Sequence, residues 1–506
     1  MSAARIASTG RGARSRGQAV VRSISESPQL PEIARPTFPI RVVDIREHGA
    51  KPGQDCTRAI ADAIKSAVSQ GGGRVLIPEG NWLTGPIHLA SNIDLHLSRG
   101  ATLRFSDDPD RYLPAVFVRW AGQECYNYSP LIYARGCTDV GITGNGKVLG
   151  NGMRWWAWQK AEQASSQRLY KMALQQTPAE QRVFGNTEYP LRPQFIQFID
   201  CQNILLEDFA IEEAGPFWSV HTAYCHNVLM RRLHINTPTG PNSNGIVIDS
   251  TRNVLIESCE LNTKDDCISL KSGLNEDGWR VNRPTENVTV RRVRCTGGDG
   301  AISFGSEMSG GIRNVRVHDC TCEGVRVGIR MKAARGRGGV VEDVEIRDIA
   351  MGVINGDAIH ITTEYSTFVS PDGRPPVFRN ILIKNITCKQ SQAAARMIGL
   401  ADSALQNVSL EHLKMMCKEG LFCTAGNGIR LIDLEITPSV GPILNVIDSQ
   451  EVLISGVNGS HEEAVFLDLR GRRTRNIRLC GEERVGQVRP AVVLGVDVPH
   501  DAVMHE

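Results

Sequence analysis

The chain has 506 residues, of which 41% are apolar and 22% are charged, and these values are typical of a folded protein. The formal net charge of +2 excludes a nucleic-acid binder that relies on bulk positive charge, so an acidic ligand would have to meet a local basic cluster. No apolar run reaches the roughly 18 residues that a transmembrane helix needs, and we therefore expect no membrane partner.

The first 40 residues are predicted to form a disordered tail. Residues 1–25 carry five arginines and no acidic residue, and residues 26–40 contain the prolines and serine of an extended lead-in. The basic stretch is similar to a transit segment, but it has no apolar signal core. The sequence therefore leaves the localisation undefined: secreted or periplasmic if the start is misassigned, and cytoplasmic otherwise.

A helix and a series of short strands follow the tail. Residues 57–69 place apolar side chains at the helical period, with Thr57 or Asp55 available as the N-cap and three glycines after the last turn. Short β-rich runs separated by turn residues come next, at 74–78, 85–89, 93–97 and 101–105. We expect the helix to cap the first coil of a long β structure.

From residue 137 onward the sequence repeats one unit, an asparagine or aspartate followed by alternating Val, Ile or Leu. The unit recurs roughly every 24 to 37 residues, at Asn203, Asn227, Asn253, Asn287, Asn314, Asp343, Asn380, Asn407 and Asn476. One such unit cannot bury its own apolar face, whereas stacked units can. No helical period separates the strands, so we predict an all-β, single-stranded parallel β-helix, or solenoid, with an asparagine ladder along it.

The predicted β-helix spans residues 41–485, and residues 486–506 are predicted to be a C-terminal tail. Residues 155–185 interrupt the repeat with a polar, helix-prone insertion. Insertions on one side of a solenoid usually line its binding face. Cys320 and Cys322 are two residues apart in a strand and are expected to pack inside rather than to bind zinc.

Acidic and basic residues occupy matching positions of consecutive repeats. Asp265 and Asp266 follow the Asn253 marker by about 12 residues, and Asp299 follows the Asn287 marker by the same interval, so we expect them about 4.8 Å apart on neighbouring coils. Three further residues lie one coil to either side, namely Asn244, Arg330 and Lys332. The set is predicted to form one face of four coils.

This set has the parts that cleavage of an acidic sugar polymer needs. Glycoside hydrolysis requires a protonated acid for the leaving oxygen and a carboxylate that activates water or attacks carbon. Adjacent aspartates raise each other's pKa, which keeps one of them protonated. The Arg330 and Lys332 side chains could neutralise a uronic-acid carboxylate. An aspartate pair alone is equally typical of a surface or calcium-binding site.

The ordered motifs carry a resemblance to a known family. Residues 242–245, 265–266, 298–300 and 330–332 appear in the order of the Asn-Thr-Asp, Asp-Asp, Gly-His-Gly and Arg-Ile-Lys signature of the polygalacturonases, glycoside hydrolase family 28. The matches extend to 71–80, 84–89, 216–218 and 305–311. The resemblance implies a right-handed parallel β-helix that hydrolyses α-linked galacturonate in pectin with inversion and needs no metal or other cofactor.

The resemblance also implies roles for individual residues. Asp265 is similar to the general acid and Asp266 to a water-activating base. Arg330 and Lys332 are similar to the residues that bind the substrate carboxylate, and Tyr365 falls near a tyrosine that lines the subsite. Trp218 and His221 would either face the cleft or pack beneath it.

Two positions depart from the family pattern. Asn244 replaces the first aspartate, and Asp299 replaces the histidine of Gly-His-Gly. An amide cannot take a proton from water, although it can orient one. A second negative charge beside Asp265 should raise a carboxyl pKa. We hypothesise that Asp299 partly replaces the lost carboxylate, as a base or by holding Asp265.

The predicted function is hydrolysis of a pectic polysaccharide or oligosaccharide by a monomeric polygalacturonase. Gly310 and Gly311, with the long loops after residues 271 and 366, suggest a cleft closed at one end and therefore exo action. The alternatives are a hydrolase of rhamnogalacturonan or another decorated pectin, and a pectin-binding β-helix with an impaired site. A pectate lyase fits less well, because such lyases use calcium carboxylates and an arginine base.

Overall fold

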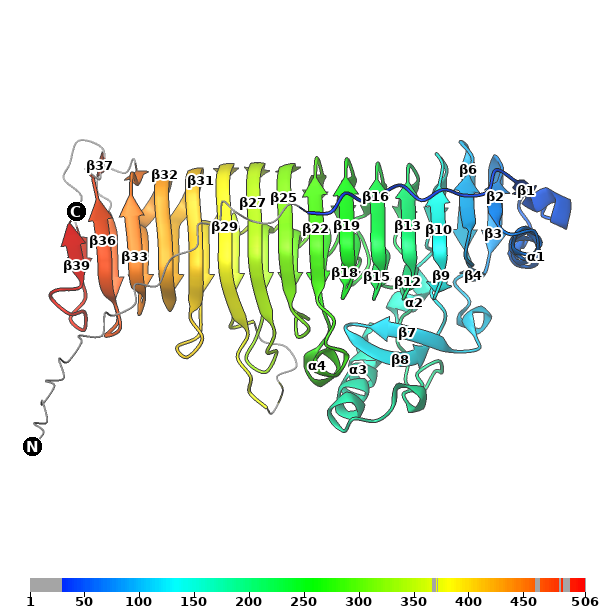
Figure 1. Ribbon diagram of the computed structural model, residues 1–506, viewed down its shortest axis with the longest axis horizontal. Helices are drawn as coiled ribbons and strands as arrows, with labels where there is room; N and C mark the ends of the chain where they lie inside the picture. Colours follow the sequence, from blue (N-terminus) through cyan, green and yellow to red (C-terminus); the bar gives the residue numbers. More distant parts are fainter. Residues whose placement is uncertain are drawn as a thin grey trace, which may run out of the picture.

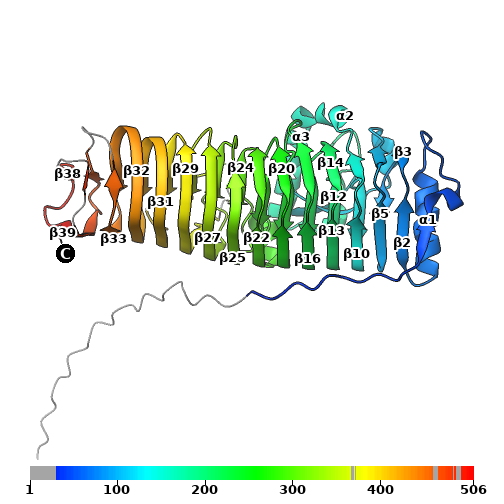
Figure 2. The ribbon, with the colours of Figure 1, turned by 90° about the horizontal axis from the view of Figure 1, so that it is seen from above.

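The computed structural model describes residues 30–365, 370, 372–459, 465–481, 484–485 and 492–505. The chain forms a long parallel β-helix whose coils run through three stacks of strands, and the strands of the coils pair in parallel with their equivalents in neighbouring coils (Figures 1 and 2). The predicted parallel β-helix is therefore confirmed. Within the described residues, no helix is long and apolar enough to cross a membrane.

The strands form three stacks along the β-helix. Stack 1 contains β4 (Ile87–His88), β9 (Ile132–Arg135), β12 (Ile196–Ile199), β15 (Val220–Ala223), β18 (Ile246–Asp249), β21 (Ile268–Lys271), β24 (Gly300–Gly305), β26 (Val327–Lys332), β28 (Ile359–Thr362), β30 (Ala393–Ile398), β35 (Leu467–Arg470) and β38 (Val492–Leu494). Stack 2 contains β1 (Val42–Asp44), β2 (Gly73–Ile77), β5 (Ile93–Leu97), β10 (Thr138–Thr143), β13 (Gln202–Glu207), β16 (His226–Arg231), β19 (Arg252–Glu257), β22 (Thr285–Arg291), β33 (Gln450–Ser455), β36 (Arg475–Cys480) and β39 (Val503–His505). Stack 3 contains β3 (Gly80–Thr84), β6 (Ala101–Phe105), β11 (Lys147–Leu149), β14 (Ala210–Glu213), β17 (His234–Thr237), β20 (Glu260–Thr263), β23 (Arg294–Gly297), β34 (Asn458–Gly459) and β37 (Arg484–Val485).

In the C-terminal half, long strands bend through more than one stack. These strands are β25 (Ile312–Cys322), β27 (Val340–Val353), β29 (Val377–Gln390), β31 (Leu405–Thr424) and β32 (Gly426–Ile447). The last parts of β31 and β32 continue stack 1 after β30. Inward-facing Val, Ile and Leu side chains of all coils fill one continuous core, which also takes up Cys320 and Cys322 as predicted.

The asparagine ladder is present and has a backbone cause. The marker residues adopt left-handed φ values, such as 58° at Asn253 and 57° at Asn287, a conformation that Asn and Asp tolerate better than other residues with a side chain. Asn287 Nδ2 donates to Asn253 Oδ1 at 2.9 Å, and Asn253 Nδ2 donates to Asn227 Oδ1 at 3.2 Å. The ladder locks the register of successive coils, because each amide both donates and accepts.

The N-terminal end of the β-helix is closed by α1 (Thr57–Ser69), as predicted. Its apolar face is buried against the first coil, and the backbone N of Thr57 donates to Asp55 Oδ1 at 3.0 Å. Residues 1–29 of the expected tail lie outside the described residues. Residues 30–40 run along the outside of stack 2 (Figure 2), where Arg35 pairs with Glu207 at 2.6 Å.

The predicted C-terminal tail is wrong where the structure describes it. Strand β38 pairs with β35, and β39 pairs with β36, so residues 492–505 complete the last coil.

Two insertions cover one part of the outer face of stack 1 (Figure 1). The predicted helical insertion forms α2 (Met153–Trp156), α3 (Gln159–Leu174) and the 3-10 turn η4 (Ala179–Gln181). An antiparallel hairpin, β7 (Val116–Trp120) with β8 (Gln123–Asn127), was not predicted. The hairpin, the α3 region and the outer side chains of stack 1 share a second apolar core, which includes Val118, Leu169, Phe217, Trp218 and Val247.

Candidate active site

Outward-facing side chains of stack 1 form rows along the β-helix. Parallel register aligns Val247, Ser269, Ser303 and Arg330 in one row. The turns that precede β18, β21 and β24 carry Asn244, the Asp265–Asp266 pair and Asp299, so these side chains lie at one edge of the same face. The structure therefore brings together all the predicted residues of the four coils.

Asp265, Asp266 and Asp299 form a compact group, with one carboxylate oxygen of each lying within 4.8 Å of the others. The turn is held by the Asp266 amide, which donates to Asp265 Oδ1 at 2.8 Å, and by Thr263 Oγ1, which donates to the Asp265 carbonyl at 2.6 Å. The adjacent Gly300 leaves room for this group, because a Cβ there would lie 2.7 Å from Asp266 Oδ1.

Asp266 is buried and bound by cations from the strand two coils further on. Lys332 Nζ donates to Asp266 Oδ2 at 2.8 Å, and Arg330 Nη1 lies 3.4 Å from Asp266 Oδ1. Burial alone would raise the pKa of Asp266, but Lys332, Arg330 and Lys271 outweigh it and hold the pKa well below its usual range. These cations therefore favour the carboxylate form of Asp266.

Asp265 has the opposite tendency. Burial raises its pKa, and the negative charge of Asp266 raises it further, with a smaller contribution from Asp299. The pKa values of the two neighbouring carboxyl groups are thus shifted in opposite directions. The protonated acid is favoured at Asp265, and the carboxylate is favoured at Asp266. This separation of environments is the feature that assigns acid and base among paired carboxyl groups.

Asp299 is held by two arginines, one of which sequence analysis missed. Arg330 Nη1 bonds Asp299 Oδ2, while Arg326 bonds Asp299 Oδ1 through Nε and Asp299 Oδ2 through Nη2, the latter at 3.1 Å. Burial would raise the pKa of Asp299, but these arginines lower it overall. Asp299 therefore fixes the position of Arg330.

Asn244 is buried at the start of β18. Its Nδ2 lies 3.5 Å from Asp265 Oδ1 and 3.3 Å from Ser269 Oγ. Its Oδ1 is buried and has no hydrogen-bond partner among the described residues. A buried acceptor without a partner costs free energy unless a water or ligand satisfies it, so Asn244 offers one acceptor beside the aspartates.

Tyr365 is placed over the cations, as the looser match implied. The Arg330 Cζ and the Lys332 Nζ each lie 5.6 Å from the centre of its ring. This ring limits the rotamers of both side chains. Residues 366–369 and 371 of the following loop, which we expected to narrow the cleft, lie outside the described residues.

The three carboxylates do not form a typical cation site. A Ca²⁺ or Mg²⁺ ion is bound by carboxylates whose oxygens are available. Lys332, Arg330 and Arg326 already neutralise Asp266 and Asp299 at short range. The donor set therefore fits charge compensation within the protein.

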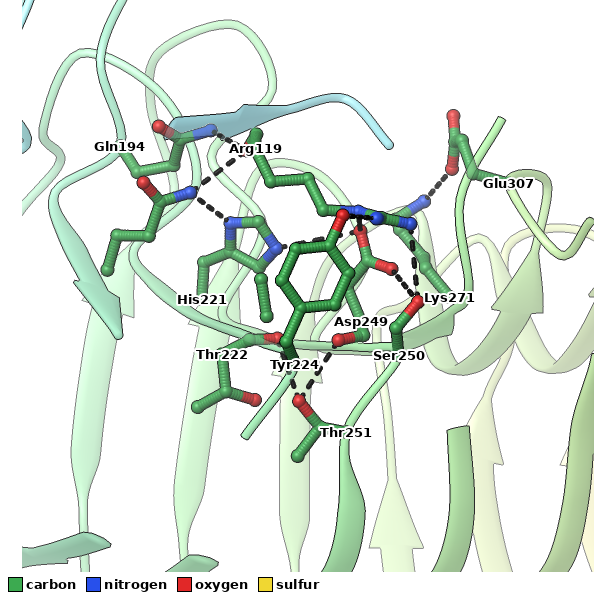
Figure 3. Close-up of polar contacts among 12 residues, drawn as sticks. Arg119, Gln194, His221, Thr222, Tyr224, Asp249, Ser250, Thr251, Lys271 and Glu307 are labelled. Carbon is green, nitrogen blue, oxygen red and sulfur yellow. Dashed lines mark hydrogen bonds and ion pairs between the residues drawn. The ribbon is translucent and has the colours of Figure 1, made fainter. Parts of the chain in front are cut away.

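The cleft face is closed on the N-terminal side by the β7–β8 hairpin. Arg119 reaches from β7 to stack 1, where its Nε donates to Asp249 Oδ2 at 2.8 Å and its Nη2 to Ser250 Oγ at 3.2 Å (Figure 3). Gln194 and Gln197 donate to the Arg119 carbonyl at 3.0 and 2.9 Å. Arg119 and Asp249 are both fully buried, and Arg119, with His221, overcomes the effect of burial and lowers the pKa of Asp249 to about 2.

The tip of the hairpin is locked to the opposite wall by α4 (Asn275–Val281), which follows β21. The backbone N of Glu124 donates to Asp277 Oδ2 at 2.7 Å, and the backbone N of Leu274 donates to the Gly122 carbonyl at 3.1 Å. Arg182 from the helical insertion binds the other oxygen of Asp277 at 2.9 Å. The hairpin therefore crosses the whole width of the outer face of stack 1. The loop after residue 271, which contains α4, holds the hairpin tip in place.

Trp218 and His221 pack beneath the hairpin and do not line the open cleft. Both are buried, and their rings meet edge to face with centres 5.0 Å apart. His221 Nδ1 lies 2.8 Å from Gln197 Nε2, and burial lowers the His221 pKa. Of the two roles that the sequence left open, the structure shows packing.

Comparisons with known proteins agree with this geometry. Residues 71–425 match the model of the family described as glycosyl hydrolases family 28. The chain is 31% identical over 392 residues to a probable polygalacturonase of Vitis vinifera, covering 74% of each protein. It resembles the crystal structure of a hyperthermoactive exopolygalacturonase from Thermotoga maritima with 34% identity and a TM-score of 0.75, over 79% of this chain and 92% of that one. An exopolygalacturonase from Yersinia enterocolitica shares the fold at 19% identity and a TM-score of 0.66, over 91% and 79% of the two chains.

Proposed function

The chain belongs to glycosyl hydrolase family 28, and from this premise we propose that it is an exo-acting polygalacturonase. The substrate would be a pectin-derived chain of α-linked galacturonate. The observation that carries the proposal is the Asp265–Asp266 pair, in which one pKa is raised and the other lowered, beside two cations at the closed end of a cleft.

In this proposal Asp265 donates its proton to the leaving glycosidic oxygen. Burial and the Asp266 charge support the role, because they keep Asp265 protonated at a pH at which an ordinary aspartate is ionised. Asp266 is the carboxylate that activates water. Asn244, in the turn of the preceding coil, would hold that water. Its buried Oδ1 has no partner among the described residues and could accept a hydrogen bond from the water.

Arg330 and Lys332 would bind the carboxylate of the galacturonate unit in the site. Arg330 also contacts Asp266 and Asp299, and Lys332 also contacts Asp266, so both are fixed before substrate arrives. Because these two cations are already ordered, binding of the substrate carboxylate does not cost the conformational entropy of fixing their side chains. Asp299 would in addition position Arg330; its role as a base or in holding Asp265 stays a hypothesis.

The closed end supports exo action. The hairpin covers β15 and β18, and the Asp265–Asp266 turn lies one coil further, a step of about 4.8 Å along the β-helix. About one sugar unit fits between the hairpin and the acid. A chain end would therefore meet the hairpin, whereas the middle of a polymer could not pass it.

The stereochemical outcome is a direct check on the role of Asp266. We propose inversion, as the family resemblance implies, so the first product from an α-linked substrate would be the β-anomer. The close approach of the carboxyl groups, within 4.8 Å, is nearer to the ~5 Å of retaining enzymes than to the ~6.5–9.5 Å of typical inverting ones. An α-anomer seen by proton NMR in the first turnover would make Asp266 a nucleophile.

The function is tested by reducing-end release from polygalacturonate, rhamnogalacturonan and xylogalacturonan, with Asp265→Asn as the inactive control. We expect activity on polygalacturonate, a slow fall in viscosity and short products from the earliest times. Activity on rhamnogalacturonan alone would assign a decorated pectin as substrate. Binding of galacturonate oligomers without release of reducing ends would indicate an impaired, binding-only site.

A further inference from the structure

The row of outward side chains that contains Arg330 continues away from the hairpin. Parallel register places His360 on β28 beside Arg330, and Arg396 on β30 beside His360. Phe422 and Asn445, on β31 and β32, follow in the next two coils. The hairpin and the helical insertion lie at the other side of the site (Figure 1), so this row continues the outer face of stack 1 away from both insertions.

Carboxylates in the preceding turns fix the two basic side chains. His360 Nδ1 donates to Asp357 Oδ2 at 2.8 Å, and Arg396 Nε donates to Asp357 Oδ1 at 3.3 Å. Arg396 Nη2 also bonds Glu419. This repeats the arrangement of Lys332 and Asp266, in which a strand supplies the cation and a turn supplies the carboxylate that orients it.

The hydrogen bonds to Asp357 and Glu419 leave two nitrogens for a ligand. The bonds engage Nδ1 of His360 and both Nε and Nη2 of Arg396, whereas His360 Nε2 and Arg396 Nη1 take no part in them. About a quarter of each side chain is exposed, 26% for His360 and 27% for Arg396.

The surroundings favour an anionic ligand. A groove of about 580 Å³ runs along the turns that precede these strands, and its lining includes the exposed Lys389 and Lys418 but no acidic residue. The positive charges of Lys389, Lys418 and Arg396 outnumber the negative charges of Asp357 and Glu419. Further along the row, Asn445 Nδ2 is buried and has no hydrogen-bond acceptor among the described residues.

We propose that His360 and Arg396 bind the carboxylates of uronate units that extend from the site along the open side of the cleft. The inference rests on the proposed function, because it takes the ligand to be an acidic oligosaccharide. Arg396 lies two coils beyond Arg330, about 10 Å away. Only a chain of more than two units reaches it, so the row selects for longer substrates.

The test compares digalacturonate with tetragalacturonate. Arg396→Gln is expected to reduce kcat/KM for tetragalacturonate about tenfold more than for digalacturonate, the effect of losing one charge-assisted hydrogen bond. Arg396→Lys should recover part of the loss. Arg379→Gln is the matched control, because Arg379 is also a partly exposed strand arginine in an ion pair, with Glu342, but on another stack.

Calorimetry separates this inference from the proposed function. In the Asp265→Asn background, added Arg396→Gln should weaken tetragalacturonate binding about tenfold, whether or not the parent enzyme hydrolyses galacturonan. Absence of hydrolysis by the parent protein would refute only the proposed function. Equal losses for both substrate lengths, or tetragalacturonate binding that Arg396→Gln leaves unchanged, would overturn the role of the row.

Discussion

Replacing Arg119 by methionine should open the closed end of the cleft. Arg119 and Asp249 are both fully buried and joined at 2.8 Å, so the substitution leaves a buried carboxylate without its cation. Breaking a buried pair in this way costs about 3–5 kcal/mol, which raises the population of the undocked hairpin by roughly two to four orders of magnitude. The loss should be local, because the β-helix beneath the hairpin keeps its own core.

Hydrogen exchange measured by mass spectrometry reports this opening directly. We expect faster exchange in residues 116–127 of Arg119→Met, with unchanged exchange in β31 and β32. The same variant should release longer oligomers from polygalacturonate, because the middle of a chain can then enter. The double variant Arg119→Met/Asp249→Asn should restore much of the protection, since it removes the unpaired charge.

Protection of the hairpin from hydrogen exchange should depend on pH in opposite directions in the parent protein and in Arg119→Met. In the parent, the pKa of Asp249 is lowered to about 2, so its stabilisation is full above the ordinary pKa near 4 and is lost as pH falls toward 2. In Arg119→Met, burial without the cation raises the Asp249 pKa, so protection should increase as pH falls. Unchanged exchange of 116–127, with unchanged product lengths, would refute the closing role of the pair.

Three further substitutions test the site. Asp265→Asn should lower kcat about 10²–10⁴-fold, the range expected for loss of a general acid, with little change in KM. If kcat falls no further than in the surface control Asp402→Asn, the assignment of Asp265 as the acid is contradicted. Asp299→Asn removes a charge that raises the Asp265 pKa, so the basic limb of the kcat profile should move to lower pH; a limb that stays in place speaks against this coupling. Lys332→Met removes a cation that lowers the Asp266 pKa, so the acidic limb should move to higher pH and KM for galacturonate oligomers should rise; if neither changes, Lys332 neither tunes Asp266 nor binds substrate.

The coil repeat made the core of the site predictable from sequence. The Asn253 and Asn287 markers fix the register of successive coils, so counting from them placed Asp266 beside Asp299 before any contact was known. The same counting placed Arg330 on the next coil. A solenoid converts sequence separation into spatial separation at a constant rate, which few folds do.

Contacts outside that repeat were not predictable in the same way. Arg119 and Asp249 are 130 residues apart and belong to different kinds of structure, an inserted hairpin and a coil. Arg326 stands in a turn, and nothing in its local sequence marks it as the partner of Asp299. The alternation of Val116, Val118 and Trp120 with Arg119 was a signal for a half-buried strand, but it did not show which surface the strand would cover.

The crossing of the hairpin to α4 also constrains the order of events after cleavage. If cleavage proceeds from chain ends as proposed, the released unit would lie between the hairpin and the remaining polymer, where the Gly122–Leu274 and Glu124–Asp277 contacts hold the hairpin across the face. The shortened polymer would then have to withdraw before the product leaves. Each encounter would then remove one unit, and the enzyme would shorten many chains gradually rather than consume one chain to its end.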